Sequence, residues 1–341
     1  MRQAPRLYPL LFEPSLHPKV WGGRQLETRL GKVLPDNEPI GESWEIYWKN
    51  RISNGPLRGK TLGELIETYP RKVLSIPNAD PEFPLLVKFL DAQDWLSVQV
   101  HPDDKRAALL EGEARGKTEC WYIIDAAPDA QIAYGLAEAL DADSFRKVIE
   151  AGRTKDVLQY VTVAPGDFIY VPAGTLHALG PGILLYELQQ TSDTTYRVYD
   201  WERPGLDGKP RELHLDKALA CTNFDVRPRA KGTPYRIQSD TPGITISQLV
   251  RGPYFSLDLL KLHRENLGST TFTKYSLNLE RDLNNGRLFY GRWDEAIRRG
   301  SMRARGRWRR PMTAGAWMHT LRMIGNYAMP GRRQAILNGE W

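Results

Sequence analysis

Short strand-like runs separated by glycine and proline dominate the first two thirds of the chain. Between residues 84 and 190 these runs are either wholly apolar or alternate between apolar and polar positions. They are "PLLVKFL" (84–90), "WLSVQVH" (95–101), "CWYIID" (120–125), "LQYVTV" (158–163), "DFIYVP" (167–172) and "ILLYELQQ" (183–190). Closely spaced runs of this length, bounded by turn residues, are typical of strands in a sandwich or barrel. The pattern therefore predicts a mainly β fold.

Helical periodicity is confined to a few short segments. Thr61 and Glu64 have the spacing of a capping box, and apolar residues follow them at helical intervals. We expect helical insertions at about 61–76, 103–111 and 138–152, and a last helix at about 214–221. These helices interrupt the β pattern without replacing it.

The stretch 206–235 has clusters of glycine, proline and charged residues, which predict a connection between two units. We expect one domain over residues 1–230 and a smaller one over 231–341. The smaller one starts with an alternating strand at 254–266, but from about residue 270 no regular period remains. A basic extension and a shifted reading frame would both produce such a change of texture.

Composition limits the class of protein further. The 341 residues are 41% hydrophobic and include 10 Trp, 15 Tyr and 9 Phe, enough for sizeable cores. No apolar run approaches the roughly 20 residues that cross a bilayer, and the N-terminus lacks the features of a signal peptide. Cys120 and Cys221 are too few for a disulfide framework or a thiolate zinc site. We therefore expect a cytoplasmic protein without a membrane partner.

The net charge of +6 at first suggests a nucleic-acid binder, but its distribution changes this picture. From Arg281 to Trp341 there are 13 Arg, no Lys and 4 acidic residues, a net charge of +9. The preceding 280 residues carry −3. The excess charge belongs to the tail, so nucleic acid is not an expected partner of the protein as a whole.

Candidate chemistry begins with "LSVQVHPDD" (96–104). Side chains alternate along a strand, so Gln99 and His101 share one face, and Pro102 then ends the strand. Two polar groups that point into a barrel need partners there. A metal ion and a buried hydrogen-bond network are both compatible with these residues alone.

A second segment, "GDFIYVPAGTLHALG" (166–180), is more specific. Gly166, Pro172, Gly174 and His177 fit the spacing G-x5-P-x-G-x2-H without a gap. This is the second motif of the cupin superfamily, small jelly-roll barrels that hold a metal, and "QVH" resembles the first motif with glutamine in place of the first histidine.

A candidate metal site results when Glu119, which opens the strand in "GKTECWYII" (116–124), is added. The predicted ligands are Gln99, His101, Glu119 and His177. Imidazole and oxygen ligands suit Zn²⁺, and also Fe²⁺, Mn²⁺ or Co²⁺. The set leaves positions open for water or substrate, which favours a catalytic metal.

In a third segment, "YELQQTSDTTYRVYDWERPG" (186–205), Asp193 and Arg197 lie four residues apart. They could form a plain salt bridge, or the arginine could reach over the metal to hold an anionic or enediolate substrate.

Together, "LSVQVHPDD", "GKTExWYI", "VPAGTLHALG" and "QxxSDTTYRxYDW" resemble the cupin-type mannose-6-phosphate isomerases (type I phosphomannose isomerases), in their short bacterial branch. "VWGGRQL" (20–26) and "GESWEI" (41–46) fit as well, and the likeness runs from about residue 8 to 225. It implies a cupin jelly-roll barrel with short helical insertions over 1–230, as the catalytic domain, and a second, smaller cupin-like barrel at the C-terminus.

The resemblance also implies roles for individual positions. The family's zinc, one per chain, would be held by the four ligands already identified. Lys117 would line the substrate site and Arg197 would be catalytic. Ser97 and Lys88 fall where the family contacts the sugar or its phosphate, and we predict Asp193 as a third substrate-binding residue. The longer eukaryotic branch reads "KPE" where this chain has "KTE" at 117–119, so contacts are carried over from the short branch only.

The implied reaction interconverts mannose 6-phosphate and fructose 6-phosphate through a cis-enediol, in a monomer or homodimer. Lys117, a water on the metal and Glu42 are candidates for the base. Two other classes stay open: a cupin iron oxygenase, and a non-catalytic protein that binds sugar phosphates, or nucleic acid through "RARGRWRR" (303–310). Lys117 and Arg197 argue against the oxygenase, because an apolar substrate would not need two cations.

Overall fold

The computed structural model describes residues 8, 10–74, 82–224, 230–232, 235–237, 244–262, 288–291 and 318–325. The chain divides into two compact units. The larger one comprises residues 10–68 and 80–232, and the smaller one residues 1–9, 69–79 and 233–341. The predicted division into 1–230 and 231–341 stays a prediction.

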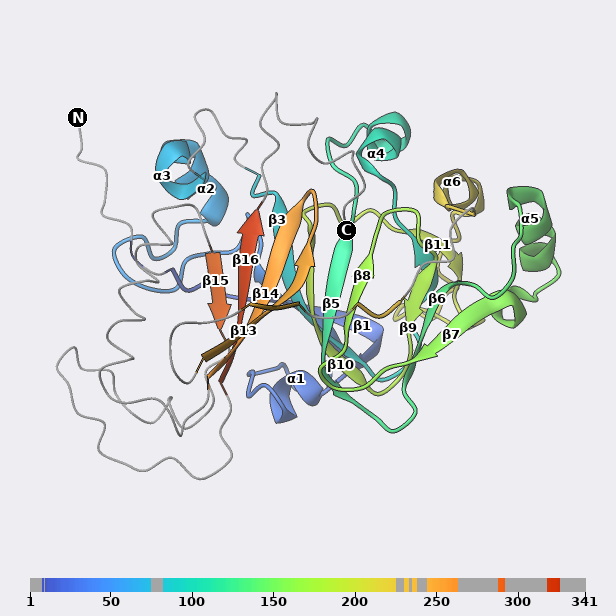
Figure 1. Ribbon diagram of the computed structural model, residues 1–341, viewed down its shortest axis with the longest axis horizontal. Coiled ribbons are helices and arrows are strands. Elements are labelled where there is room, and N and C mark those ends of the chain that lie inside the picture. The colour runs from blue at the N-terminus through green and yellow to red at the C-terminus, as the bar shows by residue number, and fades with distance from the viewer. Residues whose placement is uncertain are drawn as a thin grey trace. The chain divides into compact units, whose positions relative to one another are not determined.

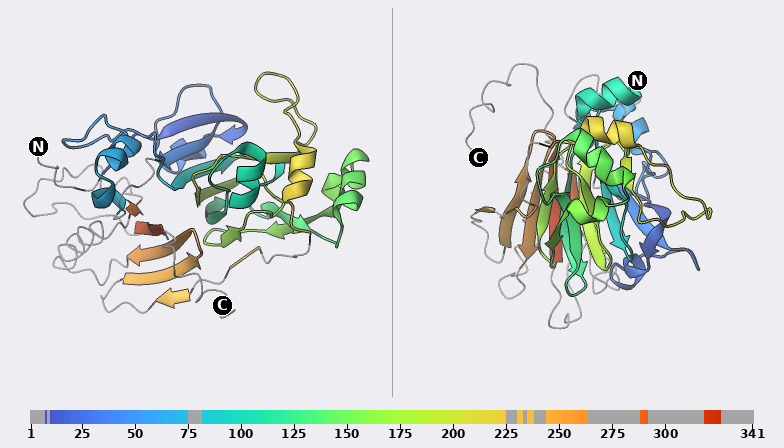
Figure 2. Two further views of the ribbon diagram at one scale, coloured as in Figure 1. Left: turned by 90° about the horizontal axis from the view of Figure 1, so that it is seen from above. Right: turned by 90° about the vertical axis from the view of Figure 1, so that its right-hand side faces the viewer.

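The larger unit consists of two antiparallel sheets that face each other (Figures 1 and 2). The six-stranded sheet has the order β1 (Ser15–Gly23), β2 (Ile40–Ile46), β3 (Leu85–Ala92), β10 (Ile183–Gln190), β5 (Glu119–Ala126) and β8 (Phe168–Val171). The five-stranded sheet has the order β11 (Tyr196–Tyr199), β4 (Val98–Val100), β9 (His177–Leu179), β6 (Gln131–Leu136) and β7 (Leu158–Thr162). The predicted mainly β, cupin-type fold is thereby confirmed.

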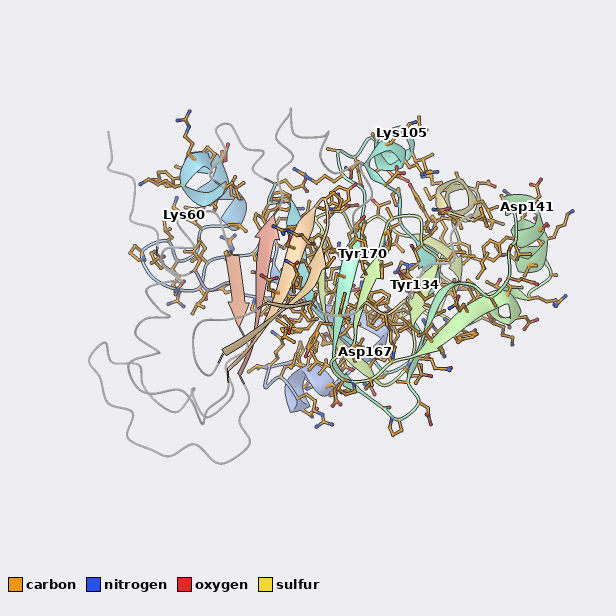
Figure 3. All side chains as sticks on the ribbon, viewed as in Figure 1. Lys60, Lys105, Tyr134, Asp141, Asp167 and Tyr170 are labelled. Carbon is orange, nitrogen blue, oxygen red and sulfur yellow. The ribbon has the colours of Figure 1, made fainter. Side chains whose placement is uncertain are left out.

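One core fills the space between the two sheets. Trp121 and Leu185 reach it from the six-stranded sheet, and Ile132 and Leu179 reach it from the five-stranded sheet. Tyr134, on β6, also crosses this space, because its hydroxyl donates a hydrogen bond to the carbonyl oxygen of Tyr170 on β8 (Figure 3). The two sheets are therefore held face to face by apolar packing and by at least one hydrogen bond.

A second core lies on the outer face of the five-stranded sheet, under helices α5 (Ala142–Glu150) and α6 (Leu215–Cys221). Figure 1 shows these two helices on the same side of the unit as α4 (Asp104–Glu111), with α1 (Gln25–Thr28) on the opposite side. Val98 and Val100 belong to this outer core. Because side chains alternate along β4, Gln99 between them faces the barrel interior, as the sequence predicted.

The predicted helices are present, with one correction. The capping box forms, since the backbone N–H of Thr61 donates to Glu64 Oε2 at 2.6 Å and that of Glu64 donates to Thr61 Oγ1 at 3.1 Å. The single helix predicted over 61–76 is instead two, α2 (Leu62–Thr68) and α3 (Pro70–Leu74). The break falls at Tyr69 because the residue before a proline disfavours the helical conformation.

In the smaller unit one antiparallel sheet is described. Its order is β12 (Tyr235–Ile237), β13 (Ile244–Arg251), β14 (Phe255–Leu262), β16 (Met318–Gly325) and β15 (Leu288–Gly291). β14 falls within the predicted strand at 254–266, and a closed second barrel stays a prediction. Apart from β15 and β16, the atypical sequence after about residue 270 lies outside the described residues. Within the described part of the chain, no helix is both long and apolar enough to span a bilayer.

Candidate active site

The candidate site lies where the interior of the barrel changes from apolar to polar. Inward-facing residues of a strand are two positions apart. On four strands, one inward-facing residue belongs to the core and the next one belongs to the site. These pairs are Leu90 and Lys88, Trp121 and Glu119, Leu179 and His177, and Leu185 and Glu187. The strand period that builds the core therefore also aims these polar side chains at one another.

Three of the four predicted metal ligands form a tight, buried cluster. One nitrogen or oxygen atom from each of the side chains of His101, Glu119 and His177 lies within 4.8 Å of the other two, and each residue is 1% exposed. His177 Nε2 is 3.2 Å from Glu119 Oε1, and His101 Nε2 is 3.6 Å from Glu119 Oε2. Glu119 comes from the six-stranded sheet and His177 from the five-stranded one, so the cluster joins the two.

Hydrogen bonds on the far side of each ring fix which histidine nitrogens face the cluster. His101 Nδ1 lies 2.9 Å from the carbonyl oxygen of Thr194, and His177 Nδ1 lies 2.9 Å from that of Thr175. A carbonyl oxygen only accepts, so Nδ1 carries the hydrogen and the Nε2 of a neutral ring presents its lone pair. Burial, and next the charge of Lys117, hold the pKa of His101 well below its usual value.

A cation fits this arrangement better than a hydrogen-bond network does. His101 Nε2 and both carboxylate oxygens of Glu119 are buried without a hydrogen-bond partner among the described residues. Burial opposes ionisation of Glu119, but the charge of Lys117 counters it, and the pKa of Glu119 is held well below the usual range. Lone pairs and a carboxylate thus face one another with no proton between them, which is the donor set of a metal site.

Gln99 also reaches this cluster. It pairs with His177 between β4 and β9, and its amide Nε2 lies 3.2 Å from His177 Nε2. Its Oε1 accepts a hydrogen bond from Ser97 Oγ at 3.3 Å. A half-turn of the amide group would exchange the two atoms and turn the oxygen, the atom that binds metals, toward His177. The structure therefore brings the predicted fourth ligand to the cluster with its nitrogen facing inward.

Lys88 is the centre of a buried charge cluster beside these ligands. Its Nζ lies 3.1 Å from Asp193 Oδ1, 3.4 Å from Glu42 Oε2 and 3.7 Å from Glu187 Oε1. Burial alone would lower the pKa of Lys88, but these three carboxylates raise it above its usual value. Asp193 therefore pairs with Lys88 and not with Arg197, so the plain salt bridge considered from the four-residue spacing does not form.

Arg197 lies on β11, opposite Gln99 on β4. Its Nη1 donates to the carbonyl oxygen of Glu212 at 2.7 Å, and its Nε is buried without a hydrogen-bond partner among the described residues. Lys117, 4% exposed, places its Nζ 3.5 Å from Glu119 Oε2. Lys117 is thus in contact with a candidate metal ligand, and Arg197 lies on the strand next to that of Gln99.

A single cavity of about 290 Å³ brings most of these groups together. It is lined by eight of the nine predicted site residues: Lys88, Ser97, Gln99, Lys117, Glu119, His177, Asp193 and Arg197. The remaining predicted site residue, His101, is in contact with the lining residue Glu119.

Sequence reasoning missed other lining residues, among them Lys19, Glu187 and Arg211. Glu187 could have been predicted from the sequence. It is a carboxylate in the apolar run "ILLYELQQ" and lies on the same face of the strand as Ile183 and Leu185. Arg211 could not, since it lies in a charged loop where arginine is ordinary.

Comparisons with known proteins identify the family of this chain. A family model described as phosphomannose isomerase type I, catalytic domain, matches residues 10–133. The "Probable mannose-6-phosphate isomerase GmuF" of Bacillus subtilis is 45% identical over 216 residues, 62% of this chain and 67% of the relative. The mannose-6-phosphate isomerase of Streptococcus mutans is 42% identical over 253 residues, 73% of this chain and 77% of the relative.

Solved structures give the same result. The crystal structure of the mannose 6-phosphate isomerase from Bacillus subtilis matches with a TM-score of 0.68 at 41% identity, over 75% of this chain and 80% of that one. A zinc-bound mannose 6-phosphate isomerase matches with a TM-score of 0.57 at 17% identity, over 73% of this chain and 82% of that one, and so shows a likeness of fold.

Proposed function

The chain belongs to the type I phosphomannose isomerase family, and we propose that it interconverts mannose 6-phosphate and fructose 6-phosphate. The observation that carries this proposal is the acceptor cluster of His101, Glu119 and His177, with two cations, Lys117 and Arg197, that line one cavity with Glu119 and His177. Such a site binds the oxygens of a sugar and stabilises negative charge on them.

The metal in this proposal is one zinc ion, held by His101, Glu119 and His177 with Gln99 as the fourth ligand. Support comes from the nitrogen and oxygen donor set and from the buried acceptor atoms that have no hydrogen-bond partner among the described residues. A zinc ion there would supply a Lewis acid that polarises the sugar oxygens.

The isomerisation moves hydrogen without net oxidation. Starting from the aldose, a proton leaves C2 and the C1 oxygen takes up negative charge, which gives the cis-enediolate; a proton then passes from the C2 oxygen to the C1 oxygen. A proton is then added at C1 while C2 becomes the carbonyl carbon. Arg197 and Lys117 are positioned to stabilise the developing oxyanion, a contribution that is worth about 3 kcal/mol for one well-placed donor.

The group that carries the proton between C2 and C1 must exchange it near neutral pH. Burial first, and next the charge of Glu119, raise the pKa of Glu187 to about 7. Glu42 is a poor base, because Lys88 and Lys19 outweigh the effect of burial and hold its pKa well below the usual range. Glu187 therefore joins Lys117 as a candidate for this step, and Glu42 serves as a charge partner. Ser97, Lys88 and Asp193 are proposed to bind the sugar.

The other classes considered from the sequence are not favoured. An iron oxygenase for an apolar substrate would not need a cavity with five cationic and four carboxylate side chains in its lining. A protein that only bound sugar phosphates is not favoured either, because the relatives that show the family are named isomerases. The segment "RARGRWRR" (303–310) lies outside the described residues. The cytoplasmic location and the monomeric or dimeric state stay predictions.

A coupled assay of mannose 6-phosphate conversion tests the proposal, on metal-stripped protein before and after addition of Zn²⁺. We expect zinc to restore turnover. His177→Ala should lose bound zinc, whereas Arg197→Ala should keep zinc, measured by elemental analysis, and lose about 100-fold in kcat. Folded, zinc-loaded protein that does not turn over mannose 6-phosphate would contradict the proposal.

A further inference from the structure

The cations that line the cavity differ in how they are neutralised. They are Lys19, Lys88, Lys117, Arg197 and Arg211. Each lysine has a carboxylate of the cavity within 3.5 Å, as in the contact of Lys19 Nζ with Glu42 Oε1 at 3.2 Å. Within the described part of the chain, Arg197 forms no ion pair, and Arg211 pairs only with Asp200, which lies outside the cavity lining. The two arginines therefore make a cationic end to the cavity.

The position of this end follows from the order of the strands. His177 is on β9, Gln99 on the next strand, β4, and Arg197 on the edge strand, β11. The segment 211–214 runs along the free side of β11, because the backbone N–H of His214 donates to the carbonyl oxygen of Arg197 at 2.8 Å. Neighbouring strands lie about 4.8 Å apart, so β9 and β11 are about 10 Å apart. Arg211 therefore comes from farther along the sheet than Arg197 does, on the side away from the candidate metal ligands.

Asp200 holds the side chain of Arg211 in place. Arg211 Nε donates to Asp200 Oδ2 at 2.6 Å, and Nη2 donates to Oδ1, so the pair is bidentate. Asp200 is 7% exposed and also accepts from Arg203 Nη2 at 3.3 Å. Arg203 pairs more closely with Asp94, at 2.7 Å, whereas among the described residues Asp200 is the only ion-pair partner of Arg211 and the nearby Arg197 Nε has no hydrogen-bond partner. The local excess of positive charge favours a dianion.

We propose that Arg211, oriented by Asp200, binds the phosphate group of the substrate, while Arg197 keeps the role at the sugar oxygens proposed above. The ligand class is a phosphomonoester dianion, and the assignment rests on the proposed function. With the C1 and C2 oxygens at the metal cluster, the phosphate on C6 lies toward Arg211. Lys88 is a poor alternative anchor, because three carboxylates already surround its ammonium group.

Arg211→Gln tests this assignment, with Arg203→Gln as the matched control, since Arg203 also pairs with Asp200 but does not line the cavity. A hydrogen bond to a charged group is worth about 1.5–3 kcal/mol, which corresponds to a 10- to 150-fold effect. We therefore expect Arg211→Gln to raise KM for mannose 6-phosphate at least 10-fold and to raise Ki for inorganic phosphate in parallel, with a much smaller change in kcat. Arg211→Lys should recover part of this loss, and Arg203→Gln should match the wild type.

An unchanged KM and Ki in Arg211→Gln, or an equal loss in Arg203→Gln, would overturn the assignment. Zinc content and thermal midpoint of each variant show that it is folded. Direct titration with inorganic phosphate separates this proposal from the proposed function. If the wild type bound phosphate through Arg211 but did not isomerise mannose 6-phosphate, the reaction would be wrong and the anion site would stand.

Discussion

Lys88 is a cation that is almost completely withdrawn from water, at 2% exposed. Glu42 and Glu187 beside it are also buried, and the ring of Trp44 lies 4.8 Å from its ammonium group. Removing one partner from a buried ionic cluster is costly, because the remaining charges stay desolvated and uncompensated. The stability of the barrel near the site should therefore depend on this one side chain.

We expect Lys88→Met to lower the free energy of unfolding by about 3–5 kcal/mol. The same substitution at Lys217 is the control, since Lys217 pairs with Glu111 at 2.7 Å on the surface, with its side chain 43% exposed. An exposed pair contributes less than about 1 kcal/mol. Urea unfolding followed by tryptophan fluorescence measures both. Equal effects of the two variants would show that the Lys88 cluster does not stabilise the fold.

At the scale of elements, the turn after β4 and the strand entry before β5 are packed backbone against backbone. The Lys117 N–H donates to the carbonyl oxygen of Pro102 at 2.9 Å. A Cβ atom on Gly116 would lie 2.4 Å from that same oxygen and 2.4 Å from the carbonyl carbon of Asp103. Only glycine permits this approach, which brings Lys117 and Glu119 to His101.

Gly116→Ala should therefore separate the two segments and lower both stability, by about 2 kcal/mol or more, and zinc affinity. Gly112→Ala is the control. Gly112 ends α4 with φ of 70° and has open space around its Cβ position, so its substitution should cost about 1 kcal/mol and leave zinc binding intact. Zinc titration of both variants checks this expectation. Normal zinc affinity in Gly116→Ala would show that the close approach is not needed for the site.

At the scale of the whole molecule, the candidate metal ligands come from both sheets of the larger unit. Glu119 belongs to the six-stranded sheet, and Gln99 and His177 belong to the five-stranded one. A ligand that binds only the folded state stabilises it, by about 2.7 kcal/mol at 100 times its Kd. Bound zinc should thus stabilise the barrel in addition to supporting the reaction.

Chelation of the metal should lower the thermal unfolding midpoint, and added Zn²⁺ should restore it. His177→Ala removes one ligand, so its midpoint should not respond to zinc. Differential scanning calorimetry with and without a chelator measures these shifts. Two results would contradict a zinc site formed by these residues: a wild-type thermal midpoint that zinc does not change, or a midpoint of His177→Ala that zinc raises as much as it raises that of the wild type.

The sequence by itself determined the features that depend on near neighbours along the chain. Because side chains alternate between the two faces of a strand, the sequence predicted that Gln99 points inward between Val98 and Val100, as observed. The capping box of Thr61 and Glu64 forms because both partners lie within one helical turn. The two motifs also identified His101 and His177, since turn residues at fixed spacings fix where each short strand begins or ends.

The tertiary structure alone decided the partnerships between distant positions. Lys88 meets Asp193 across 105 residues because β3 and β10 are neighbours in the sheet, so the short spacing from Asp193 to Arg197 was misleading. Arg211 enters the cavity because its loop follows the free edge of β11. Local periodicity sets which way a side chain points, but strand order and loop path set which charge it meets, and those depend on the packing of the whole barrel.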